Sequence, residues 1–200
     1  TADSRQQTAD SRQQTADSRQ QQRTAVRWLE LGEVCESIVS GKNMSRNKEG
    51  IYPVYGSTGV IGYSNSYIYD EDKLLVARVG ANCGFVNKAT GRYDVSDNTL
   101  IITPKAIYNL SFAYYQLTYL KLNRLAVGGG QPLVTAGKLK RVVVPIPPLE
   151  EQARIVAILD RFDALCNDLA SGLPAEIEAR KKQYEYYRDK LLTFKEKETA

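Results

Sequence analysis

The pattern of hydrophobic and polar residues divides the 200-residue chain into three segments. Residues 1–25 hold a polar tandem repeat, residues 26–148 hold short apolar runs separated by turn residues, and residues 149–197 hold apolar residues at helical spacing. We therefore predict a spacer, a globular domain and a helical arm, in that order.

The middle segment has the pattern of a mixed domain. Short β-rich runs punctuated by glycine predict strands at residues 52–55, 60–63, 73–79, 85–87, 99–103 and 142–145, and residues 28–34 are typical of a short helix or strand. Apolar residues at helical spacing predict one main helix over residues 110–125, ending before Gly128. The expected fold class is α+β (mixed α/β).

The third segment predicts an antiparallel or broken coiled-coil arm. Pro147 and Pro148 stop the preceding strand, and Glu150 and Glu151 carry the charge that a helix N-terminus favours. Apolar residues then recur at intervals of three and four, with an interruption at residues 171–174. The residues expected to pair the two helices are Ile155, Leu159, Phe162, Ile177, Tyr184, Tyr187 and Leu191.

The first segment repeats the heptapeptide Thr-Ala-Asp-Ser-Arg-Gln-Gln from Thr1, Thr8 and Thr15. One Ala per copy is far too little for a coiled-coil seam, so composition favours a solvated, disordered lead-in. A helical spacer whose length grows by about 10 Å per copy is the alternative.

The amino-acid composition limits the catalytic and metal-binding chemistry that we expect of this chain. The chain lacks histidine, which excludes the commonest general base and metal ligand. Cys35, Cys83 and Cys166 form no C-x-x-C pair, and we expect three buried thiols. Apolar runs are of strand length and the first residues do not resemble a signal peptide, so we expect a soluble cytoplasmic protein.

Motifs of enzymes are incomplete in this sequence. The glycines at 56, 59 and 62 lack the G-x-G turn of a dinucleotide site, and the glycines at 128–130 lack the Gly-Lys-Ser/Thr of a P-loop. Glu71-Asp72-Lys73 resembles a fragment of a nuclease pattern without its upstream acid, and a solvated loop explains it better. We predict no catalytic, cofactor or metal residues in this chain.

The loops of the middle segment instead combine basic, amide and glycine residues. The net charge is +4, and residues 26–150 hold 14 basic against 10 acidic residues. Arg and Lys bind guanine edges or phosphates, and Asn and Gln suit adenine. The candidate DNA-binding residues are Lys42, Asn43, Arg46, Lys48, Ser57, Arg78, Asn82, Gly128, Gly129, Gly130, Gln131 and Lys138.

Three stretches resemble the specificity subunits of Type I restriction-modification systems. They are YPVYGSTGVIGY at residues 52–63, PIPPLEEQ followed by IVAILDRFD at residues 145–163, and ARKKQYEYYRDKLL at residues 179–192. The resemblance implies a target-recognition domain that reads one half of a bipartite double-stranded DNA sequence, and an arm that spaces and docks other subunits.

The same resemblance implies a division of labour. Methylation with S-adenosylmethionine and ATP- and Mg-dependent cleavage would belong to partner modification and restriction subunits. Full subunits of the family have two recognition domains and two arms, whereas this chain has one of each. A natural half-subunit pairing with a second copy, a truncation and the distal half of a longer chain all remain open, and a homodimer would predict a palindromic bipartite target.

Two other functions compete with DNA recognition. One is a coiled-coil scaffold whose globular domain binds protein, and the other is an independent DNA enzyme. Sequence-selective binding to duplex DNA would distinguish recognition from the scaffold, and turnover without added subunits would favour the enzyme.

Overall fold

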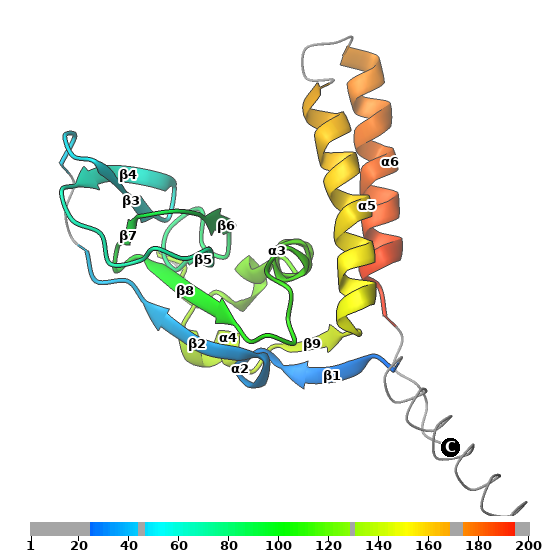
Figure 1. Cartoon of the computed structure of the whole chain (residues 1–200), viewed down its shortest axis with the longest axis horizontal. Helices are drawn as coiled ribbons and strands as arrows, with labels where there is room; N and C mark the ends of the chain where they lie inside the picture. Colours follow the sequence, from blue (N-terminus) through cyan, green and yellow to red (C-terminus); the bar gives the residue numbers. More distant parts are fainter. Residues whose placement is uncertain (1–24, 44–46, 129–130, 169–173, 195–200) are drawn as a thin grey trace, which may run out of the picture.

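The computed structural model describes residues 25–43, 47–128, 131–168 and 174–194, without the side chains of 167, 168 and 174–177. It consists of a sheet-rich body and a projecting pair of helices (Figure 1). The strands are β1 (Arg27–Glu30), β2 (Cys35–Ser40), β3 (Tyr52–Gly56), β4 (Gly59–Ser64), β5 (Lys73–Ala77), β6 (Val86–Ala89), β7 (Asp94–Val95), β8 (Thr99–Pro104) and β9 (Val143–Ile146). The helices are α2 (Leu31–Val34), α3 (Leu110–Tyr119), η1 (Leu122–Leu125), α4 (Ala136–Lys140), α5 (Leu149–Asp168) and α6 (Pro174–Leu192).

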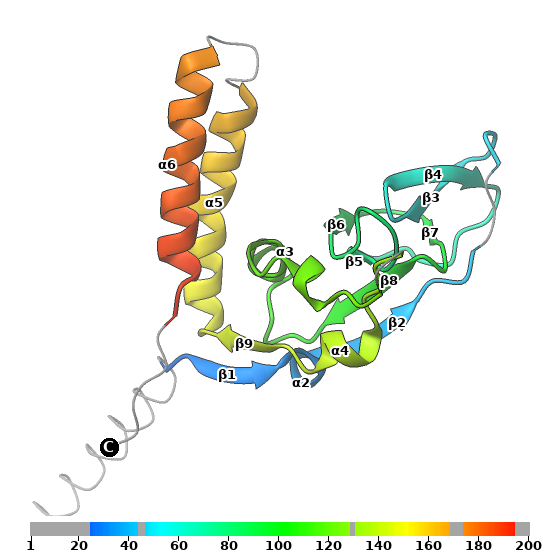
Figure 2. The same ribbon diagram turned by 180° about the vertical axis from the view of Figure 1, so that it is seen from behind.

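The strands form three sheets. The largest has the order β2-β8-β5-β6 and is antiparallel throughout. A smaller sheet, β4-β3-β7, lies at the end of the body far from the arm, and β1 pairs with β9 at the base of the arm (Figures 1 and 2). The strands predicted from alternation are confirmed to within a few residues, whereas β2, β7 and helix α4 were not predicted.

The central strand β5 has a hydrophobic core on each of its faces, because successive side chains of a strand point to opposite sides. Leu74 and Val76 belong to the main core, which includes α3, and Leu75 belongs to a second core with Tyr93 and Val95. All five residues of β5 are buried. Apolar residues therefore follow one another along β5 without alternating polar residues, because both faces of this strand are covered.

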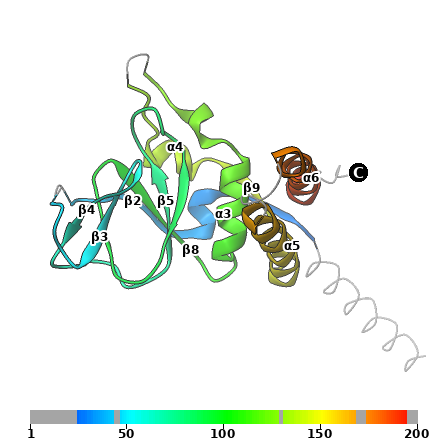
Figure 3. The same cartoon turned by 90° about the horizontal axis from the view of Figure 1, so that it is seen from above.

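Helix α3 covers the main core and lies between the sheets and the arm (Figure 3). Its N-terminus is capped by Asn109, whose side-chain oxygen accepts a hydrogen bond from the backbone N–H of Phe112 at 3.0 Å. The predicted helix over residues 110–125 was too long. Lys121 adopts a left-handed backbone conformation, with φ of 49° and ψ of 65°, which ends α3 and starts the short helix η1.

Helices α5 and α6 run antiparallel beside one another (Figures 1 and 2). The ring of Phe162 stacks on that of Tyr187 at a centroid distance of 5.3 Å and meets the edge of Tyr184 at 6.5 Å. The expected helical hairpin is thus present over the described residues, and its role as a coiled coil stays a prediction. Ile177 lies where side chains are not described.

The base of the arm is also part of the core of the body. Ile155, Leu159 and Leu192 are buried in the main core, and Tyr184 and Leu191 pack against it. The apolar stripe of the arm is therefore covered in large part within this chain. Tyr186, which was not on the predicted seam, is 61% exposed.

The cysteines and the N-terminal repeat differ from what the sequence predicted or lie beyond the described residues. Cys35 and Cys83 are buried as predicted, whereas Cys166 on α5 is only half-buried. The repeat of residues 1–24 lies outside the described residues, so its conformation stays a prediction. No helix among the described residues is long and apolar enough to cross a membrane.

Candidate nucleic-acid interface

Loops that are far apart in the sequence meet around Arg78, at the end of strand β5. The backbone N–H of Arg78 donates to the carbonyl of Asn98 at 2.9 Å, and the backbone N–H of Val134 donates to the carbonyl of Arg78 at 2.9 Å. Antiparallel pairing of β5 with β6 and β8 brings these loops to one end of the sheet. We call the group of loops at residues 40–43, 57–59, 78–85, 95–98, 127–128 and 131–134 the Arg78 loop cluster.

The guanidinium of Arg78 ties two of these loops together. Its Nη1 atom donates to the hydroxyl of Ser40 at 3.3 Å and to the carbonyl of Asp97 at 3.4 Å. The Ser40 hydroxyl itself donates to the same Asp97 carbonyl at 2.8 Å. Arg78 is only partly buried, so it both organises the loops and keeps part of its surface in solvent.

The predicted polar residues at 42, 43 and 57 join the cluster through backbone contacts. Lys42 and Asn43 donate their backbone N–H groups to the carbonyl of Val95 at 3.0 Å, and the Ser57 hydroxyl donates to the carbonyl of Asn98 at 2.8 Å. The Asn43 amide also donates to the buried carboxylate of Asp94. Lys42 remains exposed and is available to a ligand.

The loop at residues 78–85, with residues 127–128 and 131–134, forms the other side of the cluster. The backbone N–H of Gly80 donates to the carbonyl of Pro132 at 3.1 Å, and Val127 and Leu133 exchange backbone hydrogen bonds at 3.1 and 3.0 Å. Asn82, Gly128 and Gln131 are exposed on these loops. The Gln131 amide is therefore free to form hydrogen bonds with a base edge.

Some predicted residues lie apart from this group or outside the described residues. Lys48 is exposed on the segment that leads into β3, and Lys138 lies in α4 with its Nζ donating to the carbonyl of Leu125 at 3.3 Å. Arg46, Gly129 and Gly130 lie outside the described residues.

Sequence reasoning missed the polar residues that follow α3. Gly84 packs so closely on η1 that a Cβ atom there would lie 2.2 Å from the backbone nitrogen of Asn123. A pocket beside this contact is lined by Asn82, Phe85, Thr118, Lys121 and Asn123, among others. In the sequence, the polar residues Lys121 and Asn123 were the only indication of this pocket, and they lie within the segment that was predicted as one helix over residues 110–125.

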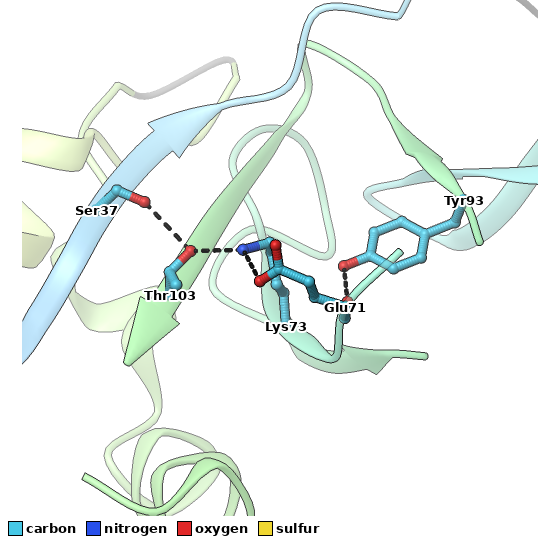
Figure 4. Close-up of polar contacts among 5 residues, drawn as sticks. All are labelled: Ser37, Glu71, Lys73, Tyr93 and Thr103. Carbon is cyan, nitrogen blue, oxygen red and sulfur yellow. Dashed lines mark hydrogen bonds and ion pairs between the residues drawn. The ribbon is translucent and has the colours of Figure 1, made fainter. Parts of the chain in front are cut away.

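The fragment Glu71-Asp72-Lys73 is a solvated loop only in part, because Glu71 and Asp72 are exposed whereas Lys73 begins β5 and is buried. Lys73 Nζ donates to the Glu71 carboxylate and to the Thr103 hydroxyl, both at 3.1 Å (Figure 4). The Ser37 hydroxyl donates to Thr103 at 3.2 Å, and the Tyr93 hydroxyl donates to the Glu71 carbonyl at 2.9 Å. These bonds attach the start of β5 to its neighbours, at the opposite end of the strand from Arg78.

The described residues include no group of three or more Cys, Asp or Glu side chains placed to hold a metal ion. In the second core, burial raises the pKa of the Tyr93 phenol, with a further contribution from the nearby Tyr69. The perturbed phenols thus lie in hydrophobic cores, and the Arg78 loop cluster offers hydrogen-bond donors and positive charge to a ligand.

Comparison with known families gives a match over most of the chain. Residues 26–179 match the family model described as the Type I restriction modification DNA specificity domain. The specificity subunit of the Type I restriction enzyme EcoprrI from Escherichia coli is 34% identical over 133 residues, which are 66% of this chain and 33% of that protein. A putative type I specificity subunit of Mycoplasma pneumoniae is 31% identical over 175 residues, which are 82% of this chain and 57% of that protein.

Solved structures show the same fold. A Type I restriction-modification S subunit from M. genitalium has a TM-score of 0.64 at 20% identity, over 74% of this chain and 41% of that one. The HsdS subunit from Thermoanaerobacter tengcongensis has a TM-score of 0.57 at 27% identity, over 84% of this chain and 44% of that one. The chain thus spans between a third and three fifths of the length of these relatives.

Proposed function

The chain belongs to the family of Type I restriction-modification DNA specificity domains, and from that premise we propose that it reads one half of a bipartite DNA target. The observation that carries the proposal is the convergence of separate loops around Arg78 at one end of the central sheet. Because this group holds Arg, Lys, Asn and Gln side chains on a rigid sheet, it has the chemistry for reading base edges and for contacting phosphates.

Within the cluster, exposure separates two roles. Arg78 is engaged by Ser40 and Asp97, so it shapes the loops, whereas Asn82 and Gln131 project into solvent. Amide side chains can pair with adenine through two hydrogen bonds. Asn82 and Gln131 are therefore the residues that we assign to base reading, with Lys42 as a phosphate contact.

The arm would position partner subunits. A solved structure described as the structural basis of complex assembly and conformational transition of the type I R-M system is similar to this chain, with a TM-score of 0.57 at 25% identity. We assign modification subunits, restriction subunits and a second specificity half as partners, so that S-adenosylmethionine, ATP and Mg are used by those subunits and the chain itself is non-catalytic. Tyr186 and Leu165, at 61% and 38% exposure, supply apolar contact area on the helices.

The deciding experiment is methylome sequencing of cells that express the chain together with a modification subunit. We expect a bipartite methylated sequence, which is palindromic if two copies of the chain pair and asymmetric if a different second half joins it. Random methylation, or none, would contradict the proposal. Strong binding of a protein partner by a chain with no sequence preference for duplex DNA would favour a scaffold instead.

A further inference from the structure

A groove that contains basic and amide side chains runs along the C-terminal end of helix α3, from the Arg78 loop cluster to the arm. Two adjoining pockets share Lys121 and Asn123. One extends to Asn82 and Phe85 on the β5–β6 loop, and the other extends to Arg124 and to Arg188 on α6. Figure 3 shows α3 between the sheets and the arm, where such a groove can connect the two. We call this the α3-end groove.

The groove carries a local excess of positive charge. Lys121 and Arg124 are exposed, and no carboxylate among the described residues forms an ion pair with either of them. Arg188 is held by Asp189, with 2.7 Å between guanidinium and carboxylate, so this pair is neutral overall. The two unpaired cations therefore set the charge of the groove.

The backbone at Lys121 is costly for a lysine. Its φ of 49° lies in the left-handed region, and Lys121 is the one non-glycine residue with positive φ in the described chain. Glycine and asparagine occupy this conformation more easily. The helix dipole stabilises a basic side chain near the C-terminal end of a helix. This stabilisation does not require a left-handed backbone, because a lysine in the right-handed conformation receives it too. The left-handed turn itself serves to end α3, and the lysine side chain that it carries is exposed and forms no ion pair with a described carboxylate.

The groove is continuous with the surface that we assign to base reading. Gly84 of the β5–β6 loop contacts the backbone of Leu122 and Asn123 so closely that no side chain fits between them. Asn82 and Phe85, the latter 59% exposed, form the shared rim. A DNA duplex seated on the loop cluster can therefore continue over the groove toward the arm.

On the basis of the proposed function, we infer that the α3-end groove binds the phosphodiester backbone of DNA beside the half-site, through Lys121 and Arg124. Such contacts place the duplex without reading its sequence. They also release counterions, so each phosphate that is neutralised steepens the dependence of affinity on salt. The groove thus adds affinity and register to the reading of bases by the loop cluster.

The test measures DNA affinity of the full chain against salt concentration, for the variants Lys121→Asn, Arg124→Gln and both together. We expect the slope of log K against log salt to become shallower by about 0.9 for each phosphate contact that is lost. The preference for the half-site over unrelated DNA should stay unchanged. Lys121→Arg should keep the wild-type slope, and Lys182→Asn, an equal charge change on α6 outside the groove, should keep it too.

Thermal unfolding separates binding from a structural role. Since asparagine fits the left-handed conformation better, Lys121→Asn should melt at the wild-type temperature or above while it binds DNA more weakly. A clearly lower melting temperature, or a double variant with the wild-type salt slope, would overturn the inference. So would unchanged DNA binding with weakened assembly with a modification subunit, which would assign the groove to an acidic protein surface.

If the chain does not read a DNA half-site, the same experiment gives a different result from the one that overturns the groove. In that case the wild-type chain would show no half-site preference at any salt concentration. The salt slope on a mixed duplex would still report whether the groove contacts phosphates.

Discussion

Gln152, in the first turn of α5, accepts a hydrogen bond at 2.8 Å from the backbone N–H of Asn109, which caps α3 43 residues earlier. The Gln152 amide also donates to the carbonyls of Ile107 and Pro147 at 2.9 and 2.8 Å. Because Gln152 is completely buried and all three bonds cross the junction between body and arm, this side chain fixes the direction in which α5 leaves the body.

Replacing Gln152 should therefore destabilise the whole chain. Gln152→Leu keeps the volume and removes the partner of the Asn109 N–H and of the Ile107 carbonyl, which are partly buried, and of the Pro147 carbonyl, which is buried. A buried polar group without a hydrogen-bond partner costs about 1–3 kcal/mol. Because the structure around the substitution can relax in part, we expect the free energy of unfolding to fall by about 2–5 kcal/mol. Urea denaturation measures it. Gln183→Leu, on the exposed face of α6, is the control, and an equal small effect in both would contradict this role.

Substitutions in the Arg78 loop cluster should separate affinity from base preference. Arg78→Ala removes the bonds to Ser40 and Asp97, so we expect weaker binding to every DNA sequence. Gln131→Ala leaves those bonds intact, and loss of one bidentate amide contact should reduce discrimination at one base pair by about 1–3 kcal/mol. Selection from a randomised duplex library measures both effects. An unchanged selected sequence for Gln131→Ala would remove that residue from the base-reading set.

The stability of the arm junction should fall at alkaline pH through Tyr184. Burial and the negative charge of Asp163 raise the pKa of this phenol to about 12, although the cation of Arg188 opposes the shift. The folded-state pKa is above the unfolded value near 10, so the stabilisation is complete below pH 10 and is lost as the pH rises toward 12.

Melting temperatures of the wild type and of Tyr184→Phe between pH 8 and 12 measure this effect. Phenylalanine keeps the ring against Phe162, and the other tyrosines contribute equally to both proteins. The wild type should therefore lose more stability than the variant across about pH 10–12. Parallel curves would show that Tyr184 does not titrate in this way.

The three thiols should differ in reactivity toward a disulfide reagent. Burial raises the pKa of Cys35 to about 12 and also raises that of Cys83, so few thiolates form at either site. Cys166 is only half-buried. We expect one fast thiol in the native chain and three after denaturation, with the fast phase absent from Cys166→Ser. A native chain with no fast thiol would contradict the placement of Cys166.

The sequence alone determined those features whose causes are local. Alternating apolar residues predicted most strands, and Pro147 and Pro148 followed by two glutamates predicted that α5 begins at Leu149. The period of the arm predicted two helices with an interruption between them. These predictions succeed because side-chain periodicity and helix-end charge act over a few residues.

Only the tertiary structure decided which residues meet. The contacts of Arg78 with Ser40 and Asp97 depend on strand register between segments 19 and 38 residues apart, which local pattern does not specify. In the same way, packing on the body buried Ile155 and Leu159, and a left-handed residue at Lys121 ended α3 early. The candidate surface and the α3-end groove exist because three-dimensional packing selected one of the arrangements that the local pattern allowed.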